Sequence, residues 1–309
     1  MIVITGPSGN VGITLTQLML RHHPSVPVRV AAYDVAEITR LCGPSECYVR
    51  LDYDDRVTWP AVLQGVKTLF LLFPLPTTKE AGTRMNPFID AAVAAGCQHV
   101  LFVSVSGAAK SKGVPHYPVE QHLKSLSIGY TFLRPCYYMQ NVCRNITTHD
   151  YDIAMYNEVF VPAGAGATAL VDARDVAEVA EKVLLNPAPH VGKAYSLTGS
   201  EQMDFTEIAA VMSRVTGRQI RYTNPSLPRF VFRMRRRGIP WDIVMFMCFF
   251  YSMIRFGKPD ALTDELKTLI GRAPRKFLQF AEEYGAVWNP EAHRQLPVIP
   301  DWAGGTGHG

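Results

Sequence analysis

Several features that would put a chain in a specialised class are scarce or absent here. Charged residues make up only 19% of the 309 residues, and the formal net charge of +4 is too small to indicate a nucleic-acid partner. The six cysteines include no Cys-x-x-Cys pair and no nearby histidine pattern. This spacing excludes the common zinc motifs, so we expect no metal site and reduced thiols, as in a cytoplasmic protein.

Long apolar runs are also missing. The first residues, MIVIT, have no basic segment and only a short apolar run, so we expect no signal peptide. Residues 241–256 form the main apolar stretch, but they include Asp242 and Arg255 and fall short of the roughly 20 residues that a spanning helix needs. We predict no transmembrane segment and a helix packed against the rest of the protein. A membrane-surface helix is the alternative, because arginines precede the stretch.

A glycine pattern stands at the start of the chain. Residues 1–5 predict a buried strand, and residues 11–20 predict a helix. Between them Gly6 permits a tight turn, Gly9 lets the backbone approach a pyrophosphate, and Gly12 lets helix and strand pack closely. The amides of the helix N-terminus then favour the anion. A glycine turn that only packs is the alternative, but we predict an NAD(P)(H) site formed by Gly6, Ser8, Gly9, Asn10, Val11 and Gly12.

Strand and helix patterns alternate through the first half of the chain. Apolar strands are predicted at 28–33, 68–73, 100–104 and 130–133, and helices at 36–41, 59–63, 85–95 and 118–126. Fully apolar strands separated by helices indicate a parallel sheet covered on both faces, and right-handed crossovers make it doubly wound. We therefore expect an α/β fold with a doubly wound parallel Rossmann sheet.

The second half has a less regular pattern. Strands are predicted at 159–162, 169–171 and 194–198, Asp175 is expected to cap a helix at 176–185, and Asp204 with Glu207 forms a capping box before a helix at 208–216. We expect a Rossmann domain over residues 1–150, which some later elements rejoin. Residues 151–300 should form a smaller, mainly helical substrate-binding lobe, and 301–309 a disordered tail.

Ligands of open α/β sheets bind at the carboxyl ends of the strands, so the side chains there are candidates. Asp34, after the second strand, suits the adenosine ribose hydroxyls and repels a 2′-phosphate, or else it caps the following helix. Further candidates are Asp52 near the adenine, Phe73 and Pro74 beside the ribose and nicotinamide, and Ser104 and Ser106 after the fifth strand.

Four stretches together resemble the NmrA-like family of the atypical short-chain dehydrogenase/reductase superfamily. They are ITGPSGNVG, HYPVEQHLKSLSIGYTFLRPCYYMQN, LVDARDVAEVA and YSLTGSEQMDFTEIAAVMSRVTG, which span most of residues 1–220. The resemblance implies an NAD(P)-binding Rossmann fold. Family members include quinone, dye and ether reductases, and also redox sensors that bind NAD(P) without turnover.

The chain departs from the superfamily at its catalytic helix. Reductases of this superfamily usually carry Tyr-x-x-x-Lys there, with the Tyr as proton donor and the Lys on the ribose. Counting back from Leu133-Arg134-Pro135 puts His116 at the Lys position and Lys112 at the Tyr position. His116 is thus the catalytic candidate, as a ribose ligand or a proton donor, unless it is only a polar residue at a helix start. Glu120, one turn later, either orients His116 or serves packing.

Two further comparisons with the family concern the ligands. Relatives carry an Arg at the end of the second strand where this chain has Tyr33, which makes an NADPH preference doubtful and favours NAD(H) slightly. The resemblance also implies that Pro135 closes the nicotinamide pocket and that Tyr137, Tyr138 and Asn141, with Ser106, face the substrate. Aromatic side chains there suit a flat apolar molecule, although they suit a core as well.

The sequence therefore predicts an NAD(P)H-dependent reductase of an apolar conjugated small molecule, such as a quinone, enone or imine. Such acceptors need less help from a Tyr acid, because delocalisation or water handles the proton. Residues 241–256 would form a lid or wall of the substrate pocket. Two alternatives stay open: an NmrA-type sensor that binds the dinucleotide and regulates a protein partner, and a non-redox isomerase or cyclase on the same fold.

Overall fold

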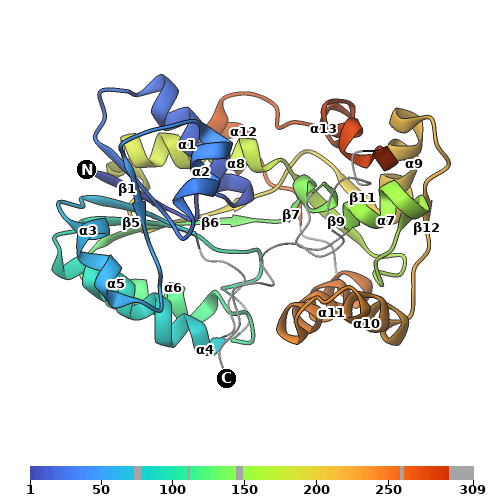
Figure 1. Ribbon diagram of the computed structural model, residues 1–309, viewed down its shortest axis with the longest axis horizontal. Coiled ribbons are helices and arrows are strands. Elements are labelled where there is room, and N and C mark those ends of the chain that lie inside the picture. Colours follow the sequence, from blue (N-terminus) through green and yellow to red (C-terminus); the bar gives the residue numbers. More distant parts are fainter. Residues whose placement is uncertain (73–77, 110–111, 144–148, 258–260, 292–309) are drawn as a thin grey trace. The chain divides into compact units, whose positions relative to one another are not determined.

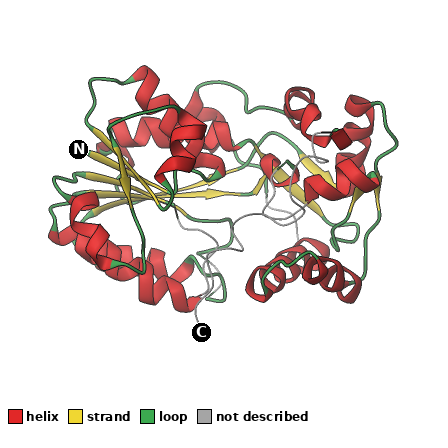
Figure 2. Ribbon diagram, in the orientation of Figure 1, coloured by secondary structure: helices red, strands yellow, loops and turns green. Residues whose placement is uncertain are grey.

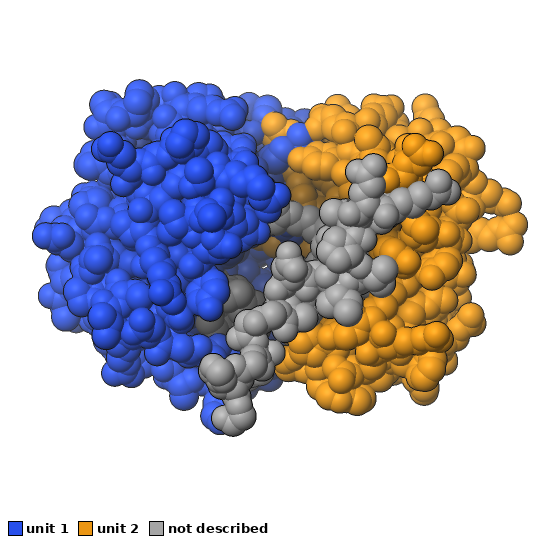
Figure 3. Space-filling view, viewed as in Figure 1, with its two compact units in different colours: residues 1–136, 173–198, 263–274 blue, residues 137–172, 199–262, 275–309 orange. Residues whose placement is uncertain are grey.

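The computed structural model describes residues 1–72, 78–109, 112–143, 149–257 and 261–291 (Figure 1). The chain divides into two compact units, which Figure 3 colours separately. The first comprises residues 1–136, 173–198 and 263–274, and the second comprises 137–172, 199–262 and 275–309. Two later segments thus rejoin the first unit. Residues 173–198 contribute α8 (Ala173–Leu185) and β10 (Lys193–Leu197), and residues 263–274 contribute α12 (Glu265–Ile270).

The first unit is built on a seven-stranded sheet in the order β10-β6-β5-β4-β1-β2-β3, and every neighbouring pair is parallel (Figure 2). This confirms the predicted doubly wound Rossmann architecture. Its other strands are β1 (Ile2–Thr5), β2 (Val28–Ala32), β3 (Tyr48–Arg50), β4 (Thr68–Leu71), β5 (His99–Val103) and β6 (Gly129–Pro135).

Helices cover both faces of this sheet (Figure 1). One face carries α1 (Asn10–His22), α2 (Val35–Cys42), α8 and α12, and the other carries α3 (Trp59–Leu63), α5 (Asn86–Ala94) and α6 (Tyr117–Ser125). The short α4 (Thr78–Glu80) and a π-helical turn at Ala81–Met85 precede α5. Because both faces are covered, the strands β1, β4 and β5 are buried along their whole length, as their apolar sequences predict.

The second unit has two small sheets and a group of helices. A three-stranded sheet has the order β11-β9-β7, and β12 pairs with β8. The strands are β7 (Tyr137–Tyr138), β8 (Glu158–Val159), β9 (Ala167–Val171), β11 (Gln202–Asp204) and β12 (Arg221–Tyr222). The helices are α7 (His149–Tyr156), α9 (Phe205–Thr216), α10 (Leu227–Arg236), α11 (Trp241–Phe256) and α13 (Phe277–Tyr284).

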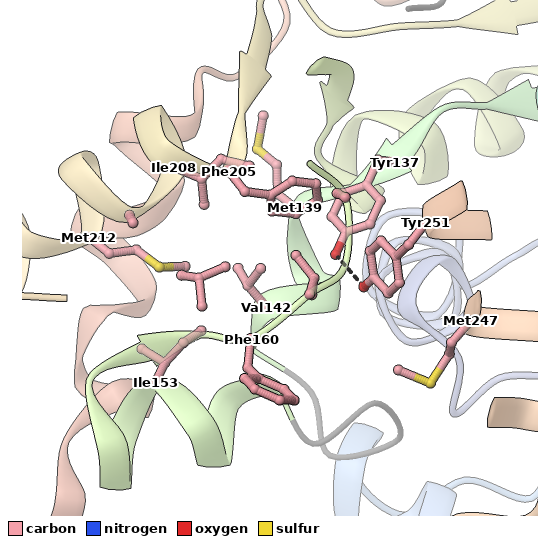
Figure 4. Close-up of a cluster of buried hydrophobic side chains, with 14 of the residues drawn as sticks. Tyr137, Met139, Val142, Ile153, Phe160, Phe205, Ile208, Met212, Met247 and Tyr251 are labelled. Atoms are coloured by element: carbon pink, nitrogen blue, oxygen red, sulfur yellow. Dashed lines mark hydrogen bonds between the residues drawn. The ribbon is translucent and has the colours of Figure 1, made fainter. Parts of the chain in front are cut away.

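An aromatic and thioether core holds the second unit together (Figure 4). Tyr137 of β7, Phe205 and Met212 of α9 and Tyr251 of α11 pack there with Phe160, which follows β8. One face of α11 enters this core through Val244, Met247, Cys248 and Tyr251. The helix predicted at 241–256 is therefore confirmed with the same limits. Among the described residues, no helix is long and apolar enough to cross a bilayer.

The structure confirms one prediction about a helix start and contradicts another. The capping box is confirmed, since Glu207 N–H donates to Asp204 Oδ1 at 2.8 Å and Asp204 N–H donates to Glu207 Oε2 at 2.8 Å, although α9 begins at Phe205. The cap predicted at Asp175 is wrong, because α8 already begins at Ala173. Asp175 is instead buried inside the first turn, where it accepts from Arg272 Nη2 at 2.7 Å.

Candidate dinucleotide site

The turn between β1 and α1 leaves no room for side chains at its glycines. Gly6 has φ +61°, a conformation that favours glycine, and a Cβ on Gly6 or Gly9 would lie 2.6 or 2.7 Å from Leu72 Cδ2. A Cβ on Gly12 would collide with the carbonyl oxygen of Gly6. The glycines therefore let Leu72 and α1 pack closely against the turn, as the glycine spacing predicts.

The N-terminus of α1 has the properties of an anion site. Its N-cap is Gly9, which brings no side-chain acceptor, and no acidic residue lies in the first turn. Ile13 N–H donates to Gly9 O, so the amides before Ile13 have no partner one turn back within the helix. Uncapped amides and the helix dipole favour a phosphate. The residues of this turn therefore fit the pyrophosphate of a dinucleotide, and Ser8, Asn10 and the buried Val11 belong to it.

Asp34 caps α2 and still has a free oxygen. Its Oδ1 accepts from the amides of Ala36 and Glu37 at 2.8 and 3.1 Å, whereas Oδ2 accepts from none of the described residues. Both predicted roles are therefore compatible, since Oδ2 remains for a ribose hydroxyl. Tyr33 beside it is 67% exposed. No basic side chain follows β2 directly, because Arg40 lies in the last turn of α2.

Arg29 is not a candidate for a 2′-phosphate. It lies in β2, and its Nη1 donates to the carbonyls of Val62 and Gln64 at 3.0 and 2.7 Å. The next predicted residue along this edge, Asp52, accepts from the amide of Asp54 at 3.0 Å and is partly exposed after β3. Phe73 and Pro74, predicted beside the ribose and nicotinamide, lie outside the described residues.

The ends of β5 and β6 carry a buried ion pair. Glu120, from the first turn of α6, has no exposed surface, and Arg134 donates to it twice, from Nε at 2.9 Å and from Nη2 at 2.6 Å. Ser104 donates its hydroxyl to the same carboxylate at 2.7 Å. The Ser104 hydroxyl proton is therefore already used in a hydrogen bond within the protein. Glu120 orients Ser104 through this bond, and its predicted role of orienting His116 has no hydrogen bond to support it among the described contacts.

His116 lies at the start of α6, almost fully buried, with its ring 5.8 Å from that of Phe102. Its Nδ1 is buried without a hydrogen-bond partner among the described residues, as are the Nδ1 atoms of His99 and His149. Burial lowers the pKa of His116 to about 4, and the opposing effect of the Glu120 charge is smaller. The imidazole is thus neutral at physiological pH, and an ordinary histidine titration between pH 5 and 8 is not expected.

The remaining predicted residues divide between the two units. Pro135 ends β6, and its carbonyl accepts from Ser106 N–H at 3.0 Å, so these two lie together at the carboxyl edge of the sheet. Tyr137, Tyr138 and Asn141 belong to the second unit. The Tyr137 hydroxyl lies 3.4 Å from that of Tyr251, and burial raises its pKa to about 12.

Two residues that support the glycine turn were not predicted. Leu72 follows β4 and lies against Gly6 and Gly9, and Thr5 Oγ1 accepts from the Leu72 amide at 3.1 Å while donating to Phe70 O at 3.1 Å. Thr5 and Leu72 come together only because β1 pairs with β4. The two strands are more than sixty residues apart, so the sequence predicts this contact only once the strand order is known.

Comparison with known proteins assigns the chain. The NmrA-like family model matches residues 1–278, so the chain belongs to the NmrA-like family. An NAD(P)H azoreductase of Xenophilus azovorans is 28% identical over 300 residues, which cover 93% of this chain and 99% of that protein. By this kinship the chain is an NAD(P)-binding oxidoreductase of the atypical short-chain dehydrogenase/reductase type, as the sequence predicted.

Solved structures share the fold. The triphenylmethane reductase of Citrobacter sp., complexed with NADP(H), matches with a TM-score of 0.77 and 22% identity, covering 92% of this chain and 99% of that one. The negative transcriptional regulator NmrA, in complex with NAD, matches with a TM-score of 0.68 and 16% identity over 96% of this chain and 98% of that one. At these identities the likeness concerns the fold alone.

Proposed function

We propose that the protein is an NAD(P)H-dependent reductase of an apolar, conjugated small molecule of the quinone, enone or imine type. The observation that carries this proposal is the glycine turn that leads into the N-terminus of α1, which has no side-chain cap. Relatives named as an azoreductase and a quinone oxidoreductase, the latter 28% identical over 244 residues, support the same reaction class.

Most predicted residues have a role toward the dinucleotide. The amides of Asn10, Val11 and Gly12, at the start of α1, hold the pyrophosphate. Asp34 accepts from the adenosine ribose through Oδ2, with Tyr33 and Asp52 on the adenosine side. Ser104 and Pro135 are assigned to the nicotinamide side. The bound cofactor supplies the hydride, and the chain supplies orientation and electrostatics.

The three candidate proton donors, Ser104, His116 and Tyr137, favour a conjugated acceptor. The Ser104 hydroxyl donates a hydrogen bond to Glu120, and burial raises the pKa of Tyr137 to about 12. His116 is neutral at pH 7 and can donate or accept one hydrogen bond there, but it brings no positive charge. None of these three groups releases a proton readily at neutral pH, so an acceptor whose reduced form takes its proton from water suits the site.

We assign substrate binding to Ser106 and to three residues that follow Pro135, namely Tyr137, Tyr138 and Asn141. The lobe formed mainly by residues 151–300 is proposed to bind the substrate. Aromatic side chains suit a flat apolar molecule, because stacking contributes about 0.5–1.5 kcal/mol beyond the area that is buried.

We also propose that NADPH is not strongly preferred over NADH. Tyr33 stands where relatives carry an Arg, and the Asp34 carboxylate repels a 2′-phosphate. Losing a charge-assisted Arg–phosphate contact costs roughly 1.5–3 kcal/mol, about tenfold to a hundredfold in affinity.

One alternative has a specific observation in its favour. The fold is shared with a transcriptional regulator that binds NAD, and this chain lacks the Tyr-x-x-x-Lys pair. A sensor that binds the dinucleotide and regulates a protein partner would show dinucleotide affinity without turnover.

Oxidation of NADH and NADPH against quinones, enones, imines and azo dyes is the direct test. Turnover of at least one class is expected, and dinucleotide binding without any turnover would favour the sensor. His116→Ala should lower turnover about tenfold to a thousandfold. His122→Ala is the matched control on the same helix, because His122 bonds Asp90 at 2.7 Å and belongs to no ligand edge. Equal turnover in both variants would show that His116 is structural.

A further inference from the structure

Tyr33 is an aromatic side chain without contacts at the carboxyl edge of the large sheet. It follows β2 directly, is 67% exposed, and makes no hydrogen bond or ring contact with the described residues. The backbone on either side of it is fixed, because Ala32 O accepts from the Leu51 amide at 2.8 Å and Asp34 caps α2. A well-anchored backbone therefore presents an unused aromatic ring to solvent, next to the candidate dinucleotide site.

The order of the strands places Tyr33 where the base of a dinucleotide is expected. β1, β2 and β3 are consecutive neighbours in the sheet, and the residue pair Ala32 and Arg50 aligns the ends of β2 and β3. A pyrophosphate at the turn after β1 and a ribose on Asp34, after β2, give the ligand a direction along this edge. The base then lies over the ends of β2 and β3, which Tyr33 and Asp52 follow.

The base can be held by its edge or by its face, and the two residues differ in what they offer. Asp52 would accept from the exocyclic amine of adenine, but its Oδ1 already accepts from the Asp54 amide at 3.0 Å and its Oδ2 lies 3.8 Å from Arg50 Nη2. The Asp52 carboxylate is thus used within its own part of the chain, whereas the Tyr33 ring is used nowhere. Stacking on an aromatic ring tolerates any base, because every base has a π-face.

We propose that the Tyr33 ring is a stacking platform for the base of the dinucleotide, so that the chain recognises this base by its face and not by the hydrogen-bonding groups of its edge. The proposal rests on the proposed dinucleotide site, but it does not require turnover. A neutral platform of this kind binds the base of NADH and that of NADPH equally well, in agreement with the weak coenzyme preference proposed above.

Calorimetry with NADH tests the platform. Tyr33→Ala should weaken NADH binding about tenfold, because the stacking surface is lost, whereas Tyr33→Phe keeps the ring and should stay within about twofold of the wild type. Val191→Ala is the control for removal of an exposed apolar side chain. Val191 is 51% exposed in the first unit and precedes β10, at the opposite edge of the sheet, so its replacement should leave the affinity unchanged.

Reduced nicotinamide hypoxanthine dinucleotide tests how the base is recognised. This analogue has an oxygen in place of the exocyclic amine of adenine, so it loses an edge contact to Asp52 and keeps the stack. Its affinity for the wild type should lie within about threefold of that of NADH, and it should fall about tenfold in Tyr33→Ala. A loss of tenfold or more in the wild type would show that the edge of the base is recognised, and would overturn the proposal.

Failure of the platform is distinguishable from failure of the proposed function. Unchanged NADH affinity in Tyr33→Ala, in a chain that still reduces acceptors, would overturn the platform alone. A wild type that binds no dinucleotide would overturn both. Thermal unfolding of Tyr33→Ala should match the wild type, because the side chain is mostly exposed. Equal losses of stability and of affinity in Tyr33→Ala and Tyr33→Phe would show that Tyr33 is structural, and would also overturn the platform.

Discussion

Each of the two units buries a carboxylate that binds arginine, but the two ion pairs join different elements. In the first unit Glu120 binds Arg134 and Ser104 where β5 and β6 end, so the ion pair orders the ligand edge of the sheet. In the second unit Asp152 lies between Arg233 and Arg237 and ties α10 to α7. The same chemistry joins a helix to two strand ends in one unit and joins two helices in the other.

The basic run before α11, residues 229–238, is partly used in ion pairs within the second unit. As a sequence, RFVFRMRRRG suggests an exposed basic surface, yet Arg233 bonds both Asp152 and Glu158, each at 2.8 Å. The Arg233 guanidinium also lies 3.4 Å from the ring centre of Phe160, and Arg237 is nearly buried. Two of the arginines are therefore structural, and a count of basic residues overstates the positive surface.

Removal of either buried carboxylate should give the largest effect. Asp152→Ala and Glu120→Ala should each lower the free energy of unfolding by about 3–5 kcal/mol, because a buried guanidinium loses its counter-charge. Urea unfolding measures both, with the exposed Glu46→Ala as the control, which should stay within about 0.5 kcal/mol of wild type. A loss below 1 kcal/mol in either variant would mean that water replaces the missing carboxylate there.

A bulky residue in the glycine turn should affect one unit only. Gly9→Val should weaken NAD(P)H binding about a hundredfold, or about 2.8 kcal/mol, because its Cβ meets Leu72 and its branches fill the pyrophosphate approach. Gly82→Val is the control, since a Cβ there meets nothing within 4 Å. Calorimetry on folded Gly9→Val decides: unchanged affinity would mean that the dinucleotide binds elsewhere.

Mild acid should destabilise both units through buried histidines. The folded-state pKa of His116 is lowered from 6.5 to about 4, so between pH 6.5 and 5 the unfolded chain takes up a proton that the folded chain does not. Stability is complete above pH 6.5 and falls by about 1.4 kcal/mol per pH unit below it, about 2 kcal/mol at pH 5.

A histidine variant in each unit tests this decline of stability with falling pH. His149, in the second unit, has its pKa lowered to about 3 by burial and by Arg237, so its slope in this window should be the same. Urea unfolding at pH 7, 6 and 5 should show a shallower decline in His116→Gln and in His149→Gln. A decline as steep as in the wild type would show that the residue concerned is protonated in the folded chain.

Coenzyme choice should show the smallest effect. NADH and NADPH affinities should agree within about tenfold, or 1.4 kcal/mol, because no cation follows β2 directly. Arg29→Ala should leave their ratio unchanged, since that guanidinium serves the carbonyls of Val62 and Gln64. A hundredfold preference for NADPH would point to Arg40, which Arg40→Ala would then abolish.

Local patterns were sufficient for part of the structure. The glycine turn, the capping box at Asp204 and the helix at 241–256 each depend on residues within a few positions, and the structure has all three. Asp175 was misassigned because its partner, Arg272, is 97 residues away. The number of residues between two groups, not their chemistry, limited the prediction.

The site shows the same limit. Nothing near His116 in sequence indicates that it is buried with its pKa lowered, because the burial comes from the sheet and α6 packing together. The pairing of Glu120 with both Ser104 and Arg134 joins three elements, β5, β6 and α6, whose order in the sheet has to be known first.

The Leu72 amide has a further consequence for experiment. It donates to the hydroxyl of Thr5, while the Leu72 side chain lies directly beneath Gly6 and Gly9. A ligand bound at the glycine turn should therefore also stabilise Leu72, whose amide donates to Thr5 on the neighbouring strand. We expect binding to slow hydrogen exchange at the Leu72 amide, and this measurement detects a bound dinucleotide even if it is never oxidised.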